Sequence, residues 1–131
     1  MMRVKDLMTP DVITIAPATT IQEAESIMKE KNIRRLIVVE QEKAVGIIVH
    51  REMIISLQSP TILKETPVEW IMTKNLITTR PDASITEAIQ TLRKYKINSL
   101  PVVEGDSLVG IITVVDLLHE LTRRLEAETT A

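Results

Sequence analysis

Thr113 and Asp116, in the stretch "GIITVVDLL" at residues 110–118, have residue types and a spacing that suit two kinds of chemistry. A threonine followed three residues later by an acid, where a buried strand gives way to a helix, forms a cap that satisfies the first amides of that helix. The same hydroxyl and carboxylate at a helix N-terminus suit a phosphate and the hydroxyls of a ribose. The two roles are compatible, so the residues alone leave both open.

The stretch has a counterpart earlier in the chain, because the sequence contains an internal repeat. Residues 4–54 align without a gap on residues 68–118, and about 18 of the 51 aligned pairs are identical. Several other pairs exchange one apolar residue for another, as a shared buried core requires. The sequence therefore predicts two units, with a linker between them and a short tail. Their expected bounds are 1–57 for the first unit, 58–67 for the linker, 68–126 for the second unit and 127–131 for the tail.

Each repeat predicts the element order β-α-β-β-α, so the predicted fold class is α/β (α+β) with two related units. The first strand is a β-branched run, at 13–15 or 77–79, that ends before a proline. Two apolar strands later form a hairpin, with turns at 41–43 and at 105–106. These strands are apolar on both faces, so helices must cover them.

The helices of each repeat are predicted from capping signals and apolar spacing. Thr20 with Glu23, and Ser84 with Glu87, have the spacing of capping boxes at the start of the first helix. The last helix carries apolar residues at 53–57 in one copy and at 117–125 in the other. These last helices hold more apolar residues than a two-unit core needs, which predicts a homodimer formed through them.

The doubled unit with "LPVVEGDSLVGIITVVDLL" resembles a tandem pair of CBS domains, a regulatory module often called a Bateman module. The resemblance covers nearly the whole chain. It implies two units packed sheet against sheet about a pseudo-twofold axis, with clefts for adenosine-containing ligands such as AMP, ADP, ATP or S-adenosylmethionine. It also implies a homodimer and a regulated effector protein as partners.

The resemblance implies a ligand site on the second copy. Asp116 would accept the ribose hydroxyls beside Thr113, and the backbone amides of 77–79 with apolar side chains near Pro101 would hold the adenine. Basic residues of the first copy would reach the phosphates, with Arg35 as the preferred ligand. The candidate ligand-binding residues are Thr113, Asp116, Ile77, Thr78, Thr79, Asn98, Ser99, Pro101, Arg34, Arg35 and Arg51.

The first copy departs from this pattern at the decisive positions. Val49 stands where the second copy has Thr113, and Glu52 stands where it has Asp116. A valine has no hydroxyl, so we expect one well-formed adenosine site per chain, anchored on the second copy. For the arginines of the first copy, a solvated basic patch stays open as the alternative.

The composition excludes several other functions. A net charge of -2 gives no electrostatic basis for binding nucleic acid, and three glycines without a phosphate-binding loop or catalytic triad argue against an enzyme. Neither histidine has partners at metal-ligand spacing, so no metal site is expected. The absence of cysteine, of a signal sequence and of a long apolar run favours a cytoplasmic protein. An adaptor that dimerises or docks without a ligand remains the alternative function.

Overall fold

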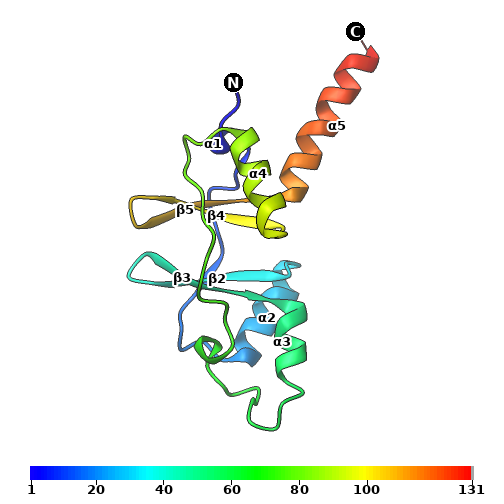
Figure 1. Ribbon diagram of the computed structural model, residues 1–131. Coiled ribbons are helices and arrows are strands. Elements are labelled where there is room, and N and C mark those ends of the chain that lie inside the picture. Colours follow the sequence, from blue (N-terminus) through cyan, green and yellow to red (C-terminus); the bar gives the residue numbers. More distant parts are fainter. Residues whose placement is uncertain (131) are drawn as a thin grey trace. The chain divides into compact units, whose positions relative to one another are not determined.

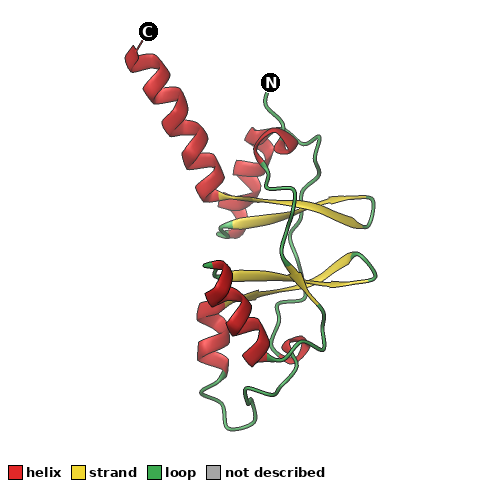
Figure 2. Cartoon of the chain, turned by 180° about the vertical axis from the view of Figure 1, so that it is seen from behind, coloured by secondary structure: helices red, strands yellow, loops and turns green. Residues whose placement is uncertain are grey.

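The computed structural model describes residues 1–130, without the side chain of Thr130, so the end of the predicted tail lies outside the described residues. The chain divides into two compact units. Unit 2 is Ile13–Leu76, and unit 1 combines Met1–Val12 with the described chain from Ile77 onward. In each unit the helices lie on one face of the strands (Figures 1 and 2). The predicted mixed α/β class is confirmed.

Unit 2 follows the predicted order and adds one short helix at its end. Strands β1 and β2 pair in parallel, β2 and β3 pair antiparallel, and the helices cover them. The elements are β1 (Thr14–Ile15), α2 (Ile21–Lys31), β2 (Arg35–Glu40), β3 (Lys43–Val49), α3 (His50–Ser56) and the 3-10 helix η1 (Val68–Trp70).

Unit 1 repeats this plan with a shorter first strand and a longer last helix. The expected strand at 77–79 is reduced to a bridge between Thr79 and Val102. The last helix extends beyond the apolar stretch at 117–125. The elements are α1 (Val4–Leu7), α4 (Ile85–Tyr95), β4 (Ser99–Glu104), β5 (Ser107–Thr113) and α5 (Val114–Thr130).

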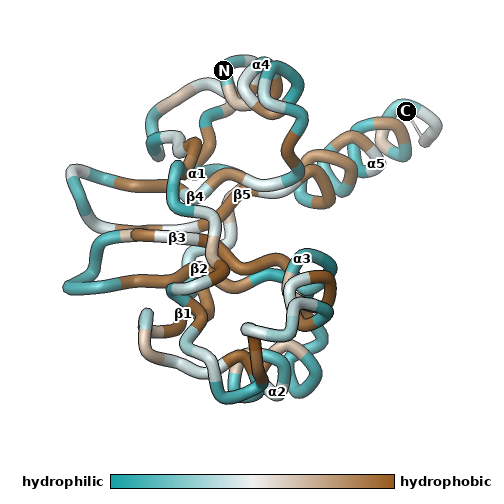
Figure 3. The backbone as a smooth tube through the Cα atoms, turned by 60° about the horizontal axis from the view of Figure 1, so that its bottom comes forward, coloured by the Kyte–Doolittle hydropathy of each residue, from teal (hydrophilic) through white to brown (hydrophobic). Residues whose placement is uncertain are grey.

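Local signals in the sequence explain where the elements begin and turn. At α2 the predicted capping box forms in full, because Thr20 Oγ1 accepts the amide of Glu23 at 3.1 Å and the Glu23 carboxylate accepts the amide of Thr20 at 3.2 Å. At α4 half of the predicted box is present in the described chain, in which Ser84 accepts the amide of Glu87. Gly105, with φ of 63°, provides the left-handed backbone that its hairpin turn requires. The hairpin tips are hydrophilic, whereas apolar residues line the strands (Figure 3).

Each unit is completed by a segment that belongs, by sequence, to the other repeat. Val4 is fully buried in the core of unit 1, and Val68 is fully buried in the core of unit 2. Thr9 exchanges two backbone hydrogen bonds with Ile111, at 2.8 and 3.0 Å, and Thr73 does the same with Ile47, at 3.0 Å each. The compact units therefore differ from the repeats by this exchanged segment.

The exchanged segments pass close to two glycines at equivalent positions. A methyl group on Gly110 would lie 2.9 Å from the carbonyl oxygen of Thr9 and 2.7 Å from the sulfur of Met8. The three atoms nearest to a methyl group on Gly46 would all belong to the side chain of Met72. Met8 packs against the core of unit 1 and Met72 against the core of unit 2. No helix in residues 1–130 is long and apolar enough to cross a membrane.

We predict that Gly110→Ala destabilises the protein more than Gly46→Ala does. At Gly110 a paired backbone carbonyl must move, whereas at Gly46 a flexible methionine can adopt another rotamer. Overpacking of a core typically costs about 1 to 3 kcal/mol, and Gly110→Ala should lie at the upper end. Urea denaturation of both variants measures the difference. Equal losses in the free energy of unfolding would mean that the backbone around Thr9 moves as easily as the side chain of Met72.

Candidate functional site

Three of the predicted ligand residues of the second repeat, Ser99, Pro101 and Thr113, lie on one face of the hairpin in unit 1. Ser99 pairs with Thr113 and Pro101 pairs with Ile111, so these four side chains share a face. The buried residues Leu100 and Val102 alternate with them and belong to the core. The strand β5 ends at Thr113, which places the start of α5 at the edge of this face.

Thr113 and Asp116 form a reciprocal cap at the start of α5. One carboxylate oxygen, Oδ2 of Asp116, accepts the amide of Thr113 at 2.8 Å and its hydroxyl at 3.1 Å. The amide of Asp116 donates in turn to the Thr113 hydroxyl at 3.2 Å. The capping interpretation is therefore confirmed. Within the described residues the other carboxylate oxygen, Oδ1, accepts no hydrogen bond, and the side chain is half-buried.

The backbone around this cap is already partly paired. The amide of Thr79 donates to the carbonyl of Pro101 at 3.0 Å, and the carbonyl of Thr79 accepts the amide of Val103 at 2.9 Å. If the amide of Thr79 bound an adenine, as expected, its hydrogen bond to the carbonyl of Pro101 would have to break. Ile77 packs against the core and Thr78 is exposed. Their roles stay predictions.

The backbone carbonyl of Asn98 lies next to the cap. It accepts the amide of Val114, the first residue of α5, at 2.9 Å. In unit 2 the carbonyl of Arg34 accepts the amide of His50 in the same way, at 2.8 Å. The residue before the second strand is thus fixed beside the last helix in both units, with an exposed side chain in each case.

The equivalent corner of unit 2 has no cap. Val49 precedes α3 and makes no side-chain hydrogen bond to the helix, and Glu52 is exposed. The predicted difference between the copies at these positions is present in the structure. The arginines that the sequence predicted as phosphate ligands belong to this unit. Arg34 and Arg51 are exposed, Arg35 is half-buried opposite Val49, and no side-chain hydrogen bond or ion pair of theirs is seen within residues 1–130.

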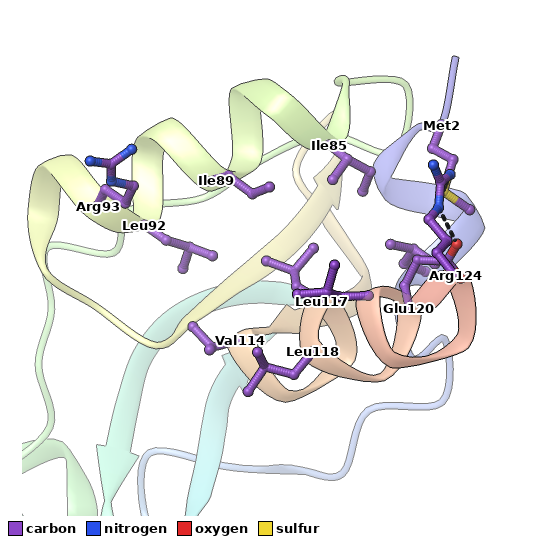
Figure 4. Close-up of a pocket in the computed structure, with 12 residues that line it drawn as sticks. Met2, Ile85, Ile89, Leu92, Arg93, Val114, Leu117, Leu118, Glu120 and Arg124 are labelled. Atoms are coloured by element: carbon purple, nitrogen blue, oxygen red, sulfur yellow. Dashed lines mark hydrogen bonds and ion pairs between the residues drawn. The ribbon is translucent and has the colours of Figure 1, made fainter. Parts of the chain in front are cut away.

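A second feature of unit 1 is an apolar groove between α4 and α5, which we call the α4–α5 groove. Ile85, Ile89 and Leu92 project from α4 toward α5, and Leu117 projects back toward α4 (Figure 4). Leu118 and Leu121 are 53% and 52% exposed. The groove has a volume of about 420 Å³. Its lining consists of Met2, Leu7, Ile85, Ile89, Leu92, Arg93, Val114, Leu117, Leu118, Glu120, Leu121 and Arg124.

The charged groups at the rim of this groove are largely paired within α5. Glu120 accepts hydrogen bonds from Arg123, at 2.9 and 2.7 Å, and from Arg124 at 2.8 Å. These hydrogen bonds, from Arg123 first and then from Arg124, lower the pKa of Glu120 from 4.5 to about 2. Glu120 therefore stays ionised under ordinary conditions, and its single negative charge is shared by two guanidinium groups.

Unit 2 holds a polar pocket of about 390 Å³, which we call the α2–α3 pocket, and four of its lining positions align with lining positions of the α4–α5 groove. Glu25 replaces Ile89 of the other repeat, and His50 replaces Val114. Its lining consists of Glu25, Met28, Lys29, Asn32, Ile33, Arg34 and His50. The aligned lining positions thus differ at Glu25 and His50, whereas Met28 and Leu92 are both apolar and Lys29 and Arg93 are both basic.

The sequence interpretation found the apolar excess of the last helix but missed the contribution of α4. The signal was present in the repeat alignment, which places Ile89 on Glu25 and Val114 on His50. An apolar residue that replaces a charged one at a shared position marks a surface with a different role. Among the described residues, no group of three or more histidine or acidic side chains could hold a metal ion.

Comparison with known proteins gives consistent matches over nearly the whole chain. A family model described as CBS domain matches residues 4–59 and 63–123. The CBS domain-containing protein YhcV of Bacillus subtilis (strain 168) is 37% identical over 117 residues, which cover 89% of this chain and 84% of YhcV.

Solved structures agree with these matches. The protein named for acetoin utilization (AcuB) from Vibrio cholerae has a TM-score of 0.89 at 31% identity, covering 100% of this chain and 98% of that chain. The CBS domain pair of protein MJ0100, solved in complex with 5′-methylthioadenosine and S-adenosyl-L-methionine, has a TM-score of 0.84 at 30% identity. That alignment covers 95% of this chain and 98% of the other.

We predict that the cap can be removed from one unit and built into the other. Thr113→Val should lower the free energy of unfolding by about 0.5 to 2 kcal/mol, the usual cost of losing an N-cap. Val49→Thr creates the spacing of a capping box with Glu52 and should raise stability by a smaller amount. Thermal denaturation of both variants tests the pair. A neutral Thr113→Val would show that the cap contributes nothing to stability and that the pair is kept for another reason.

Proposed function

The chain belongs to the CBS domain family, and from this premise we propose that it is a regulatory module that binds an adenosine-containing ligand and signals to a partner protein. The ligand class is AMP, ADP, ATP or S-adenosylmethionine. The observation that carries the proposal is the Thr113–Asp116 cap, which holds one carboxylate oxygen and leaves Oδ1 without a partner among the described residues. The MJ0100 pair, whose solved complex contains two adenosine compounds, supports the ligand class.

In this proposal Asp116 accepts the ribose hydroxyls, because an ionised carboxylate is a strong and charge-assisted acceptor. Thr113 and the first amides of α5 lie beside it, at the positive end of a helix of 17 residues. Asn98 and Ser99 lie beside the same corner through their backbone pairing with Val114 and Thr113. Pro101 and the backbone at Ile77 and Thr78 are the proposed contacts of the adenine.

We propose Arg34, Arg35 and Arg51 as phosphate ligands. Their guanidinium groups have no ion-pair partner within residues 1–130. A guanidinium binds a phosphate through two parallel hydrogen bonds. A guanidinium without an ion-pair partner can do so without breaking an existing ion pair. Unit 2 lacks the capping hydroxyl, so the proposal is one well-formed adenosine site per chain.

The proposal includes a homodimer, formed through the last helices, and an effector protein whose identity stays open. An adaptor function without any ligand is a second candidate, and the α4–α5 groove favours it because such a groove can dock a partner by itself. A thermal shift separates the two, since a ligand at a hundredfold excess over its Kd stabilises the folded state by about 2.7 kcal/mol. The cytoplasmic location stays a prediction.

Asp116→Asn should weaken the binding of adenosine ligands while it leaves the fold intact. The amide keeps the shape of the cap, so stability should fall by about 1 kcal/mol or less. Binding should weaken by about 1.5 to 3 kcal/mol, because the ribose hydroxyls lose an ionised acceptor. Titration calorimetry measures the affinity. Glu52→Gln in unit 2 is the matched control and should bind as the wild type does. Normal binding by Asp116→Asn would show that Asp116 is a helix cap and nothing more.

Phosphorylated ligands should bind more tightly than adenosine itself. The expected gap between AMP and adenosine is about 1.5 to 3 kcal/mol, the range of a charge-assisted hydrogen bond. High salt should narrow this gap, because ions screen exposed charges. Arg35→Gln should lower the affinity for AMP and leave that for adenosine unchanged, so adenosine serves as the control ligand. Equal affinities for the two ligands in the wild type would place the arginines in a solvated patch.

A further inference from the structure

The α2–α3 pocket of unit 2 is lined by charged groups that are available to a ligand. Glu25, Lys29 and Arg34 line it together with the half-buried His50. In the part of the chain that the structure describes, none of these four side chains makes a hydrogen bond or an ion pair. Glu25 and Lys29 are one helical turn apart, a spacing at which ion pairs commonly form, and they too are unpaired within residues 1–130.

The fold does not require polar groups at two of these positions. The repeat alignment places Ile89 on Glu25 and Val114 on His50. Unit 1 forms the same arrangement of helices and hairpin with these apolar residues. An acid and an imidazole that the backbone arrangement does not need, beside two cations in one pocket, indicate a role in binding.

The helix α2 sets the spacing of the charges in the pocket. Glu25, Lys29 and Asn32 follow one another at intervals of four and three residues, so they lie on one face of α2. At 1.5 Å per residue, Glu25 and Lys29 are about 6 Å apart along the helix axis. Arg34 follows the end of α2, and its carbonyl accepts the amide of His50 at 2.8 Å. The acid therefore lies toward the start of the helix, and the cations lie toward its end.

These charges match those of an acidic amino acid one for one. Glu25 can accept hydrogen bonds from an ammonium group, while Lys29 and Arg34 can each donate to a carboxylate. A phosphate, or a dicarboxylate without an amine, would instead bring a negative ligand against Glu25, which disfavours it. The volume of about 390 Å³ lies within the range of small-molecule sites, about 300 to 1,000 Å³. The buried Met28 adds an apolar wall for the carbon chain of the ligand.

We infer that the α2–α3 pocket binds an acidic amino acid, with the ammonium group at Glu25 and the two carboxylates at Lys29 and Arg34. The inference goes beyond the proposed function and uses neither Thr113 nor Asp116. Arg34 is also a proposed phosphate ligand, so the experiment changes Glu25 and Lys29 instead.

Titration of the whole chain with L-glutamate, followed by NMR of isotopically labelled methionine methyl groups, tests the inference. Met28 lines the pocket and is 2% exposed, so its methyl signal reports on a ligand there. Met28→Leu, which introduces the residue type of the aligned Leu92, identifies that signal. The signal should move saturably with L-glutamate. L-glutamine lacks one carboxylate and glutarate lacks the ammonium group, so each should bind about tenfold or more weakly.

Two variants assign the charges. Glu25→Gln should remove most of the preference for L-glutamate over glutarate, because the ammonium group loses its ionised acceptor and glutarate is no longer repelled. Lys29→Gln should weaken the binding of L-glutamate about tenfold. Glu25→Ile, which introduces the residue type of the aligned Ile89, replaces Glu25→Gln if that variant does not fold. The matched control is Glu30→Gln, because Glu30 is an exposed acid of α2 outside the pocket lining, and it should bind L-glutamate as the wild type does.

Three results would overturn the inference. The first is a Met28 signal that does not move with millimolar L-glutamate or L-aspartate. The second is equal binding of L-glutamate, L-glutamine and glutarate by the wild type. The third is an unchanged preference for L-glutamate in Glu25→Gln. Titration of the same variants with AMP separates this site from the proposed adenosine site, since Glu25→Gln and Lys29→Gln should bind AMP as the wild type does.

Discussion

The backbone pairing of Thr9 with Ile111, and of Thr73 with Ile47, is the interaction on which both units depend. It attaches a segment of one repeat to the sheet of the other and brings Val4 and Val68 into cores where both are fully buried. Without its first 12 residues, unit 1 would lose the helix α1 and the side chain that fills the centre of its core. Neither repeat of the sequence therefore contains a complete unit.

This exchange also explains two features that would otherwise look incidental. A glycine occurs at the same strand position in both repeats because the exchanged segment runs directly over it, closely enough that any side chain would collide. A methionine precedes the paired threonine in both repeats because a flexible side chain can fill the irregular space above that glycine. In each unit, therefore, the Met-Thr pair of one repeat and the glycine of the other repeat belong to the same contact.

Much of the fold could be predicted from the sequence, because the elements depend on local signals and on the apolar pattern. The hairpins, their turns and the cap at Thr20 follow from residues close to one another in the chain. The exchange could not be predicted. Val4 and Val68 are the same residue in similar contexts, so nothing in either repeat indicates which core it enters. The expected strand at 77–79 is reduced to a bridge because its pairing depends on Val102, which is distant in the sequence. At the candidate site, the Thr113–Asp116 cap could be predicted from its spacing. The α4–α5 groove could not, because it depends on how α4 and α5 lie beside each other.

The helix α5 connects the two surfaces that matter most for the proposed function. Its first turn contains Asp116, and the next residues, Leu117, Leu118 and Leu121, line the groove. At 1.5 Å per residue, Asp116 and Leu121 are about 7.5 Å apart along the helix axis. A ligand that holds the start of α5 would act on the same rigid element through which the proposed homodimer would form, with no intervening loop. Any such coupling must be reciprocal, because a ligand that strengthens the dimer by some factor is itself bound more tightly by the dimer by that factor. In unit 2, α3 begins without such a cap. A single helix of unit 1, α5, therefore has both a polar start and an apolar side.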